Sequence, residues 1–152
     1  MLIFTGQYEI KIDAKGRLKL PADLLRQIPE EMRKSYVLNK GLDNCLRLYP
    51  AQQWKEITEE MTKQLSYFKN EDRKFLKYFY QGATNIELDG SDRILVPKRL
   101  QDLVSIQSDI VINAYHDAIE IWGREAYYAD LKEPENFADM ADAIWSKLSN
   151  KQ

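Results

Sequence analysis

Apolar and polar residues alternate in four short segments, and these segments flank two similar loops. The alternating apolar positions are Tyr8, Ile10 and Ile12 before the first loop, Leu18 and Leu20 after it, Ile86 and Leu88 before the second, and Ile94 and Val96 after it. A period of two is typical of half-buried β-strands. Each loop is therefore predicted to join two strands, either as a hairpin or as a tight strand exchange.

The two loops belong to an internal repeat. Asp13-Ala14-Lys15-Gly16-Arg17 recurs 76 residues later as Asp89-Gly90-Ser91-Asp92-Arg93. Pro21 and Pro97 follow the second strand of each copy, where proline fits the first turn of a helix. Short helices are expected through Leu24-Leu25 and through Leu100-Leu103, followed by strand pairs at 36–38 with 45–48 and at 110–112 with 118–121. A unit this small buries its apolar face poorly alone, so the two copies should interlock around one core.

The loop residues predict tight turns. The carboxylate of Asp13, and by analogy that of Asp89, can accept hydrogen bonds from backbone amides two residues on. Gly16 permits a positive φ, and Gly90 is expected to give the same freedom to the second copy. Because Asp92 stands where Gly16 stood, the second loop is expected to adopt a different turn.

Helical periodicity appears between and after the repeats. Between them, apolar residues recur at helical spacing at Trp54, Ile57, Met61, Leu65 and Phe68, and Asn70 to Gln81 indicates a second helix ended by Gly82. This helical hairpin is unusually aromatic, which fits either internal packing or contact with another subunit. A third helix is expected from Glu125 to Leu131, and a capped helix from Asn136 to Leu148. The predicted fold class is α+β, with a first repeat at 5–54, a helical connector at 55–81, a second repeat at 82–127 and an acidic helical tail at 128–152.

Charge is distributed unevenly along the chain. Residues 1–81 carry 15 Lys and Arg against 11 Asp and Glu, whereas residues 82–152 carry 7 against 13, within a formal net charge of −2. Around the loops, residues 10–26 have a net charge of +3 and residues 86–102 a net charge of −1. A charge run of this kind is either a solvated face or a surface for a polyanion. Its position at a repeated turn favours the polyanion.

Several classes of function find no support in the composition. One cysteine cannot form an intramolecular disulfide, and Cys45 lies in an apolar run as a small buried hydrophobe. His116 is the only histidine, and no nucleophile triad, metal-ligand spacing or nucleotide-binding glycine pattern accompanies it. We therefore expect no catalytic residues, no metal, no cofactor and no small-molecule substrate. The segment 1–4 is too short for a signal peptide and charges interrupt each apolar run, so a cytoplasmic protein without a membrane partner is expected.

Six motifs, in order along residues 3–128, carry a resemblance to a known family. They are Phe4-Thr5-Gly6-x-Tyr8, Ile12-Asp13-Ala14-Lys15-Gly16-Arg17-Leu18, Leu46-x-Leu48-Tyr49-Pro50-x-x-x-Trp54, Phe79-Tyr80-Gln81-Gly82-Ala83, Asp89-x-x-x-Arg93-Ile94-Leu95-Val96-Pro97 and Ile119-Glu120-Ile121-Trp122. The chain thereby resembles MraZ proteins, the bacterial transcriptional regulators of the division and cell wall gene cluster, built from two SpoVT-AbrB-like modules. Two positions depart from the family pattern: many members have a basic residue at Thr5 and glycine at Asp92.

The resemblance implies a fold and a partner. It implies a swapped-hairpin β fold in each repeat, a ring-shaped homo-oligomer such as an octamer or dodecamer, and binding to direct repeats in double-stranded promoter DNA on the nucleoid. The family's DNA-contacting loop falls on residues 13–17, with Arg17 the first candidate and Lys15 the next. The remaining candidates are Lys11, Lys19 and Arg93. An ion pair with Asp13 or Asp89 that braces the loop is the alternative role for the two arginines.

A second class of function stays open beside DNA binding. An acidic, aromatic surface on this chain would suit a protein-interaction scaffold that acts on a partner, such as an rRNA methyltransferase. A scaffold would assemble without binding DNA, whereas a regulator of this family would do both.

Overall fold

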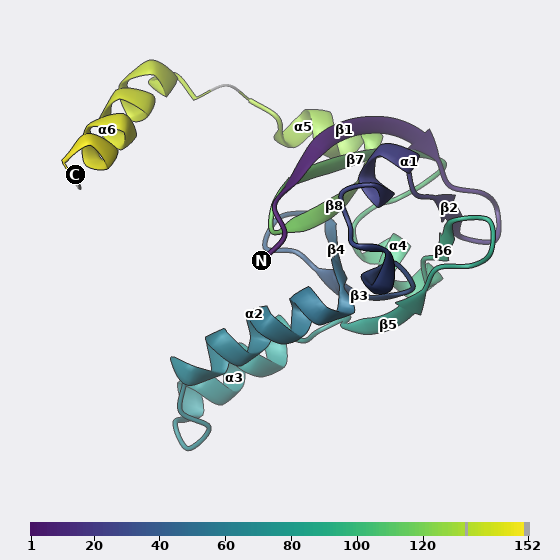
Figure 1. Ribbon diagram of the computed structural model, residues 1–152, viewed down its shortest axis with the longest axis horizontal. Helices are drawn as coiled ribbons and strands as arrows, with labels where there is room; N and C mark the ends of the chain where they lie inside the picture. Colours follow the sequence, from purple (N-terminus) through teal and green to yellow (C-terminus); the bar gives the residue numbers. More distant parts are fainter. Residues whose placement is uncertain (133, 151–152) are drawn as a thin grey trace.

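Eight strands form two sheets in the computed structural model, which describes residues 1–132 and 134–150. The larger sheet is antiparallel, in the order β1-β7-β8-β4-β3-β5, and the smaller sheet pairs β2 with β6. The strands of the first half are β1 (Phe4–Lys11), β2 (Arg17–Lys19), β3 (Ser35–Lys40) and β4 (Leu46–Pro50). Those of the second half are β5 (Thr84–Glu87), β6 (Arg93–Leu95), β7 (Asp109–His116) and β8 (Ala118–Gly123). Strands of the two halves are intermixed in the larger sheet: the pair β7–β8 of the second half lies between β1 and β4 of the first, and β5 of the second half lies at the edge beside β3 (Figure 1).

The two repeats exchange strands. β1 pairs with β7 of the other repeat, and its counterpart β5 pairs with β3. The pairs β2–β6 and β4–β8 each join equivalent strands of the two copies. The whole set is thus related by a pseudo-two-fold axis through β2–β6 and β4–β8. The prediction of two interlocked repeats in an α+β fold is confirmed, with strand exchange rather than a local hairpin.

One hydrophobic core lies between the sheets and is shared by both repeats. Leu18 of β2 and Ile94 of β6 face it from the small sheet, with 1% and 0% of their surface exposed. Leu24 and Leu100, on the short helices α1 (Ala22–Leu25) and α4 (Lys98–Leu103), are fully buried. Truncation of a buried leucine typically costs about 2–5 kcal/mol. The small sheet is therefore held by the core through its inner face, and its outer face is left to solvent.

The first loop is closed by its own backbone and by the carboxylate of Asp13. The amide of Gly16 donates to the Asp13 carbonyl (3.0 Å), and the amide of Asp13 donates to the Arg17 carbonyl (2.9 Å). Asp13 Oδ1 accepts bonds from the amides of Lys15 and Arg17, each at 2.9 Å. Gly16 has a φ of +88°, the left-handed conformation that favours glycine.

The second loop has the same turn, so the expectation of a different one was wrong. The amide of Asp92 donates to the Asp89 carbonyl (3.1 Å), and Asp89 Oδ1 accepts from the amides of Ser91 (2.8 Å) and Arg93 (2.9 Å). Asp92 itself takes the left-handed position with a φ of 60°. Aspartate tolerates this region better than most residues. Gly90 lies outside the left-handed region and a Cβ there would meet open space, so Asp92, not Gly90, occupies the position where the turn demands a positive φ.

Each loop is fixed to the opposite repeat. The carbonyl of Gly16 accepts a hydrogen bond from the amide of Val96 (2.7 Å), and the carbonyl of Asp92 accepts one from the amide of Leu20 (2.9 Å). These two bonds extend the β2–β6 pairing by one residue at each end. Neither loop can therefore move without disturbing the strand of the other repeat.

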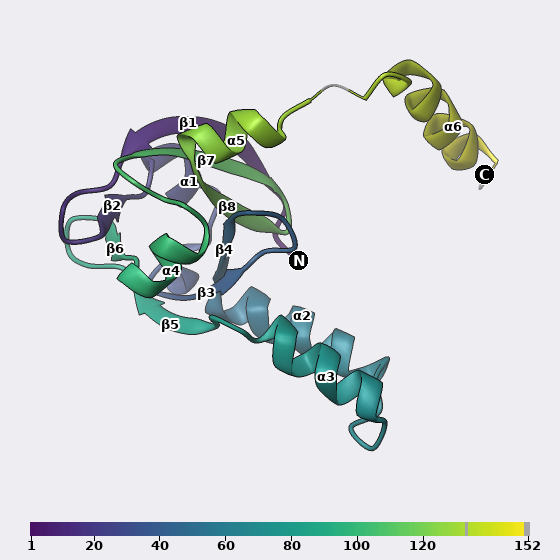
Figure 2. The same cartoon turned by 180° about the vertical axis from the view of Figure 1, so that it is seen from behind.

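A helical hairpin projects from the strand-rich body (Figures 1 and 2). It comprises α2 (Ala51–Lys63) and α3 (Asn70–Phe79), which pack together through the stacked rings of Trp54 and Phe79, with centroids 5.8 Å apart. The Trp54 ring also contacts Tyr49 of β4, with centroids 5.2 Å apart, and so joins the hairpin to the body. Leu65 and Phe68 were expected to continue the first helix, but it ends at Lys63. The chain must reverse there, and the Ser66 amide is held by the carboxylate of Asp72 (2.7 Å).

Two helices follow the last strand. α5 (Arg124–Asp130) packs on β7 and β8 through Tyr127, close to the expected bounds. α6 (Phe137–Ser149) lies apart from the body in both views (Figures 1 and 2). Asn136 forms no side-chain cap at the start of α6, and the amide of Phe137 donates to the Pro134 carbonyl (3.1 Å). Among the described residues, no helix is both long and apolar enough to cross a membrane.

The loop geometry predicts opposite effects at two equivalent positions. In Gly16→Ala the new Cβ would lie 2.7 Å from the Val96 carbonyl oxygen, in a left-handed conformation that by itself costs about 1–2 kcal/mol. We expect a melting temperature lowered by about 4 °C or more. Asp92→Gly relieves the same conformation and should change the melting temperature by less than about 2 °C. Thermal unfolding followed by circular dichroism measures both, and equal losses in the two variants would contradict the assigned turns.

Candidate nucleic-acid interface

The outer face of the β2–β6 ribbon carries four side chains. In the antiparallel register Arg17 lies opposite Leu95, and Lys19 lies opposite Arg93. Since Leu18 and Ile94 point into the core, the residues on either side of them point outward. The ribbon therefore presents three cations and one leucine on a surface that is two strands wide. In both views this ribbon and its loops lie at the end of the body opposite α6 (Figures 1 and 2).

The two arginines are held in matching ways. Arg17 Nε donates to Asp13 Oδ2 at 2.8 Å, and Arg93 Nε donates to Asp89 Oδ2 at 3.0 Å. Both arginine side chains are 35% exposed. The ion pairs considered as an alternative role are thus present in both loops. They engage only the ε-nitrogen, and a guanidinium has four further N–H donors on its terminal nitrogens. The pair fixes the direction of each arginine without consuming its terminal fork.

The loop aspartates are ionised at neutral pH. The backbone amide of Arg17 is the main cause that lowers the pKa of Asp13, and the amide of Arg93 does the same for the pKa of Asp89. A lowered folded-state pKa stabilises the protein above the ordinary value for aspartate, about 3.9. That contribution is lost as pH falls through the lower folded-state pKa. The loops and the directions of their arginines are therefore insensitive to pH in the neutral range.

The predicted lysines surround the first loop. Lys11, Lys15 and Lys19 are all exposed, at the end of β1, at the loop tip and on the ribbon respectively. Lys11 lies opposite Asp109 of β7 in the register, so part of its field is offset locally. Lys15 and Lys19 flank Arg17 along the chain. The structure thus brings Lys15, Arg17 and Lys19 together with Arg93 on one surface, with Lys11 at its border.

The second loop carries less positive charge than the first. Its tip holds Ser91 and Asp92 where the first loop has Lys15 and Gly16. Nearby, Lys98 pairs with Asp102 at 3.0 Å, which offsets its charge. The two loops share a backbone but differ in charge, so a polyanion would meet the first loop more favourably.

Leu95 is the surface residue that sequence reasoning missed. It is 54% exposed between Ile94 and Val96, which are 0% and 1% exposed. Three consecutive apolar residues in a short strand must place one of them outward, because side chains alternate between the two faces. The alignment with the exposed Lys19 was the available signal.

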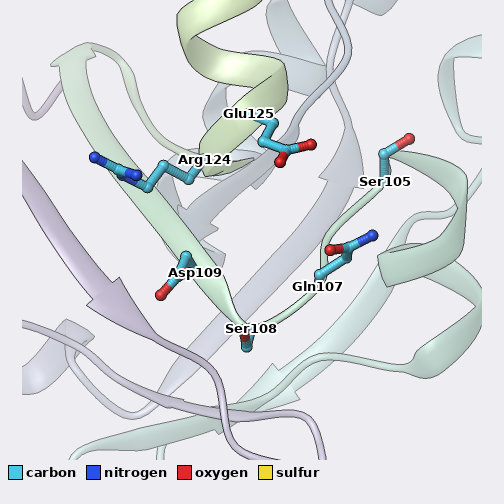
Figure 3. A pocket seen from close by; sticks show the side chains of 6 residues that line it. All are labelled: Ser105, Gln107, Ser108, Asp109, Arg124 and Glu125. Atoms are coloured by element: carbon cyan, nitrogen blue, oxygen red, sulfur yellow. The ribbon is translucent and has the colours of Figure 1, made fainter.

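A small hollow elsewhere on the body offers no convergent chemistry. It is lined by Ser105, Gln107, Ser108, Asp109, Arg124 and Glu125 and has a volume of about 100 Å³. Typical small-molecule sites are larger, about 300–1,000 Å³, and aim a few polar groups at one point. In Figure 3 the Arg124 guanidinium extends away from the Glu125 carboxylate. The described residues also contain no group of three or more His, Cys, Asp or Glu that could hold a metal ion.

Cys45 and His116 form no catalytic arrangement. Cys45 is 0% exposed, and burial raises the pKa of its thiol, which disfavours the nucleophilic thiolate. The prediction that it is a buried hydrophobe is confirmed. His116 is exposed at the β7–β8 turn with a φ of 54°, and the adjacent Asp117 pairs with Arg47 at 2.7 Å. These contacts hold the turn in place.

Comparison with known proteins gives one consistent match. The family model described as "MraZ protein, putative antitoxin-like" matches residues 3–78 and again residues 79–146. A protein named transcriptional regulator MraZ from Thermoanaerobacter sp. (strain X514) is 40% identical over 147 residues, covering 97% of this chain and 94% of the relative. Proteins of the same name from Christiangramia forsetii and Flavobacterium psychrophilum are 34% and 31% identical, with coverage of 95% and 100% of this chain and 94% and 98% of those relatives. Two family matches in tandem, on a pair of strand-exchanged repeats, show that the chain belongs to the MraZ family of transcriptional regulators.

Proposed function

We propose that this protein is a sequence-specific DNA-binding regulator that reads repeated promoter boxes through the β2–β6 ribbon. The observation that carries the proposal is the outer face of that ribbon, where Arg17, Lys19 and Arg93 are held on a rigid two-stranded element. The names of the relatives support regulation of transcription. The resemblance further suggests the promoter of the division and cell wall gene cluster as the target, and a cytoplasmic, nucleoid-associated protein without catalytic activity.

The ribbon suits the major groove of B-form DNA. That groove is about 12 Å wide and admits a two-stranded β-ribbon, and arginine can bond guanine O6 and N7 bidentately. With Nε bound to Asp13, the two terminal nitrogens of Arg17 remain to form such a pair. Exposed Lys15 and Lys19 would contact phosphates, which position a protein on the duplex without specifying its sequence. Arg17 is thus proposed to recognise the base sequence, and Lys15 and Lys19 to hold the DNA backbone.

Self-association would complete the binding surface. One ribbon makes few contacts, so several ribbons on a ring, matched to successive boxes, would gain affinity through effective concentration. Apolar surface for such contacts is available away from the ribbon. On α6 the side chains of Phe137, Ile144, Trp145 and Leu148 are each more than half exposed, and Tyr78 of α3 is 75% exposed. We propose that α3 and α6 form the contacts between subunits of the ring. The acidic tail at residues 128–152, which includes α6, would then be held away from DNA.

Exposed aromatic residues also favour one second candidate, an interaction scaffold. Tyr67 and Phe68, at the tip of the α2–α3 hairpin, are 72% and 93% exposed and could contact another protein. A scaffold would not need cations at the ribbon. Loss of DNA binding on mutation of the ribbon is therefore the result that separates the two functions.

Arg17→Ala should abolish specific binding to a fragment carrying the protein's own promoter. It removes both the guanine-reading fork and a charge, whereas Lys15→Ala removes a phosphate contact and should weaken binding less. Arg93→Ala should also cost less, because Asp92 lies beside it and lowers the attraction for a polyanion there. Fluorescence anisotropy with labelled promoter DNA measures all three.

Lys63→Ala is the matched control for that series, since it removes one exposed cation on α2, remote from the ribbon. It should bind like the unmodified protein. If a folded Arg17→Ala variant bound the promoter as tightly as the unmodified protein, the ribbon would not be the DNA-binding surface. A greater loss in Arg93→Ala than in Arg17→Ala would instead reverse the ranking of the two loops.

Assembly should appear in the dependence of binding on salt. Each phosphate contact contributes about 0.9 to the slope of log affinity against log salt concentration, so the slope should steepen from one box to two and three. Truncation after Leu131 tests whether the tail assists assembly: we expect the slope on one box to be unchanged and the gain from further boxes to shrink. Anisotropy titrations at several salt concentrations, with sedimentation of the free protein, give both quantities. Equal affinities and slopes for all three fragments would rule out cooperation between ribbons.

A further inference from the structure

Leu95 is the apolar side chain among the four on the outer face of the ribbon. Its chain neighbours Ile94 and Val96 are buried in the core, but Leu95 is 54% exposed on the outer face. The equivalent position in the first repeat is Lys19, so the two halves of the ribbon differ most in chemistry at this point. An exposed leucine among Arg17, Lys19 and Arg93 contributes little to the fold and no attraction for phosphate. An exposed leucine among cations would be explained if the polyanion that they bind also has an apolar group at this position.

Leu95 is kept open by the loop beside it. A Cβ placed on Gly16 would lie 3.6 Å from Leu95 Cδ1, within van der Waals contact. The absence of a side chain at Gly16 therefore leaves this flank of the leucine uncovered. On the neighbouring strand Arg17 lies directly opposite Leu95, and its direction is fixed by the bond to Asp13. The side chains of Leu95 and Arg17 thus leave the outer face from opposite strands at the same end of the ribbon.

We propose that Leu95 contacts the C5-methyl group of a thymine next to the guanine read by Arg17. This inference rests on the proposed DNA-binding function and assigns it a second specificity-determining residue. In the major groove the thymine methyl is the apolar feature that apolar side chains recognise. Directly opposite residues in an antiparallel pair have Cβ atoms about 4.5–5.5 Å apart. Base pairs are stacked about 3.4 Å apart, so the two side chains reach adjacent base pairs.

Deoxyuridine tests the contact because it differs from thymidine only in lacking the C5-methyl group. A promoter fragment synthesised with deoxyuridine in place of thymidine keeps its base pairing but lacks each C5-methyl. The unmodified protein should bind this fragment about fourfold more weakly or worse, the effect expected for loss of one buried methyl group. Leu95→Ala should bind the thymine fragment more weakly and show little further loss on the uracil fragment. Lys19→Ala, on the same face, should weaken binding yet keep the full sensitivity to the methyl groups.

Each outcome of this comparison decides the proposal. If Leu95→Ala remains as sensitive to deoxyuridine as the unmodified protein, the methyl groups are read elsewhere and the inference fails, while loss of binding in Arg17→Ala still upholds the proposed function. If Arg17→Ala also binds normally, the proposed function fails. A change of oligomeric state in Leu95→Ala, measured by sedimentation, would show that a second copy of the chain covers the leucine, which also overturns the contact. Thermal unfolding should be nearly unchanged, because the side chain is exposed.

Discussion

The exchange of backbone hydrogen bonds between the two loops is the constraint on which the binding surface depends. The carbonyls of Gly16 and Asp92 hold the amides of Val96 and Leu20, so each loop is completed by the opposite repeat. The short β2–β6 ribbon would be a poor element alone, with three residues in each strand. Its ends are held by these bonds and its inner face by the core. A rigid surface results because neither repeat can fold its loop independently.

Much of the architecture could be predicted from the sequence because its signals are local and occur twice. Alternation marked the strands, Pro21 and Pro97 marked the short helices, and the duplicated loop indicated one shared core. The loop aspartates were also foreseeable, since a carboxylate that accepts nearby amides is an ordinary turn device. The duplication mattered most: an ambiguous pattern in one copy could be interpreted with the other.

What escaped prediction depends on contacts that are remote in sequence. Asp92 was expected to change the turn, but the bond from Leu20 and the carboxylate of Asp89 impose the same turn on both loops, and aspartate accepts the positive φ. The end of α2 at Lys63 is set by the reversal toward α3, which periodicity through Leu65 and Phe68 could not reveal. The alternation of Ile94 and Val96 already placed Leu95 on the outer face, but its position opposite Arg17 required the register of β6 with β2.

The difference between Lys19 and Leu95 gives the ribbon a polarity. A perfectly two-fold ribbon would look the same after a half-turn about its axis, and it could not distinguish the two directions in which a duplex runs. Here one end pairs arginine with leucine and the other pairs lysine with arginine. On the DNA duplex proposed as its ligand, a surface of this kind would favour one orientation, and neighbouring copies along the duplex would then all point the same way. The two repeats thus share one loop backbone, and their different side chains alone make the outer face of the ribbon directional.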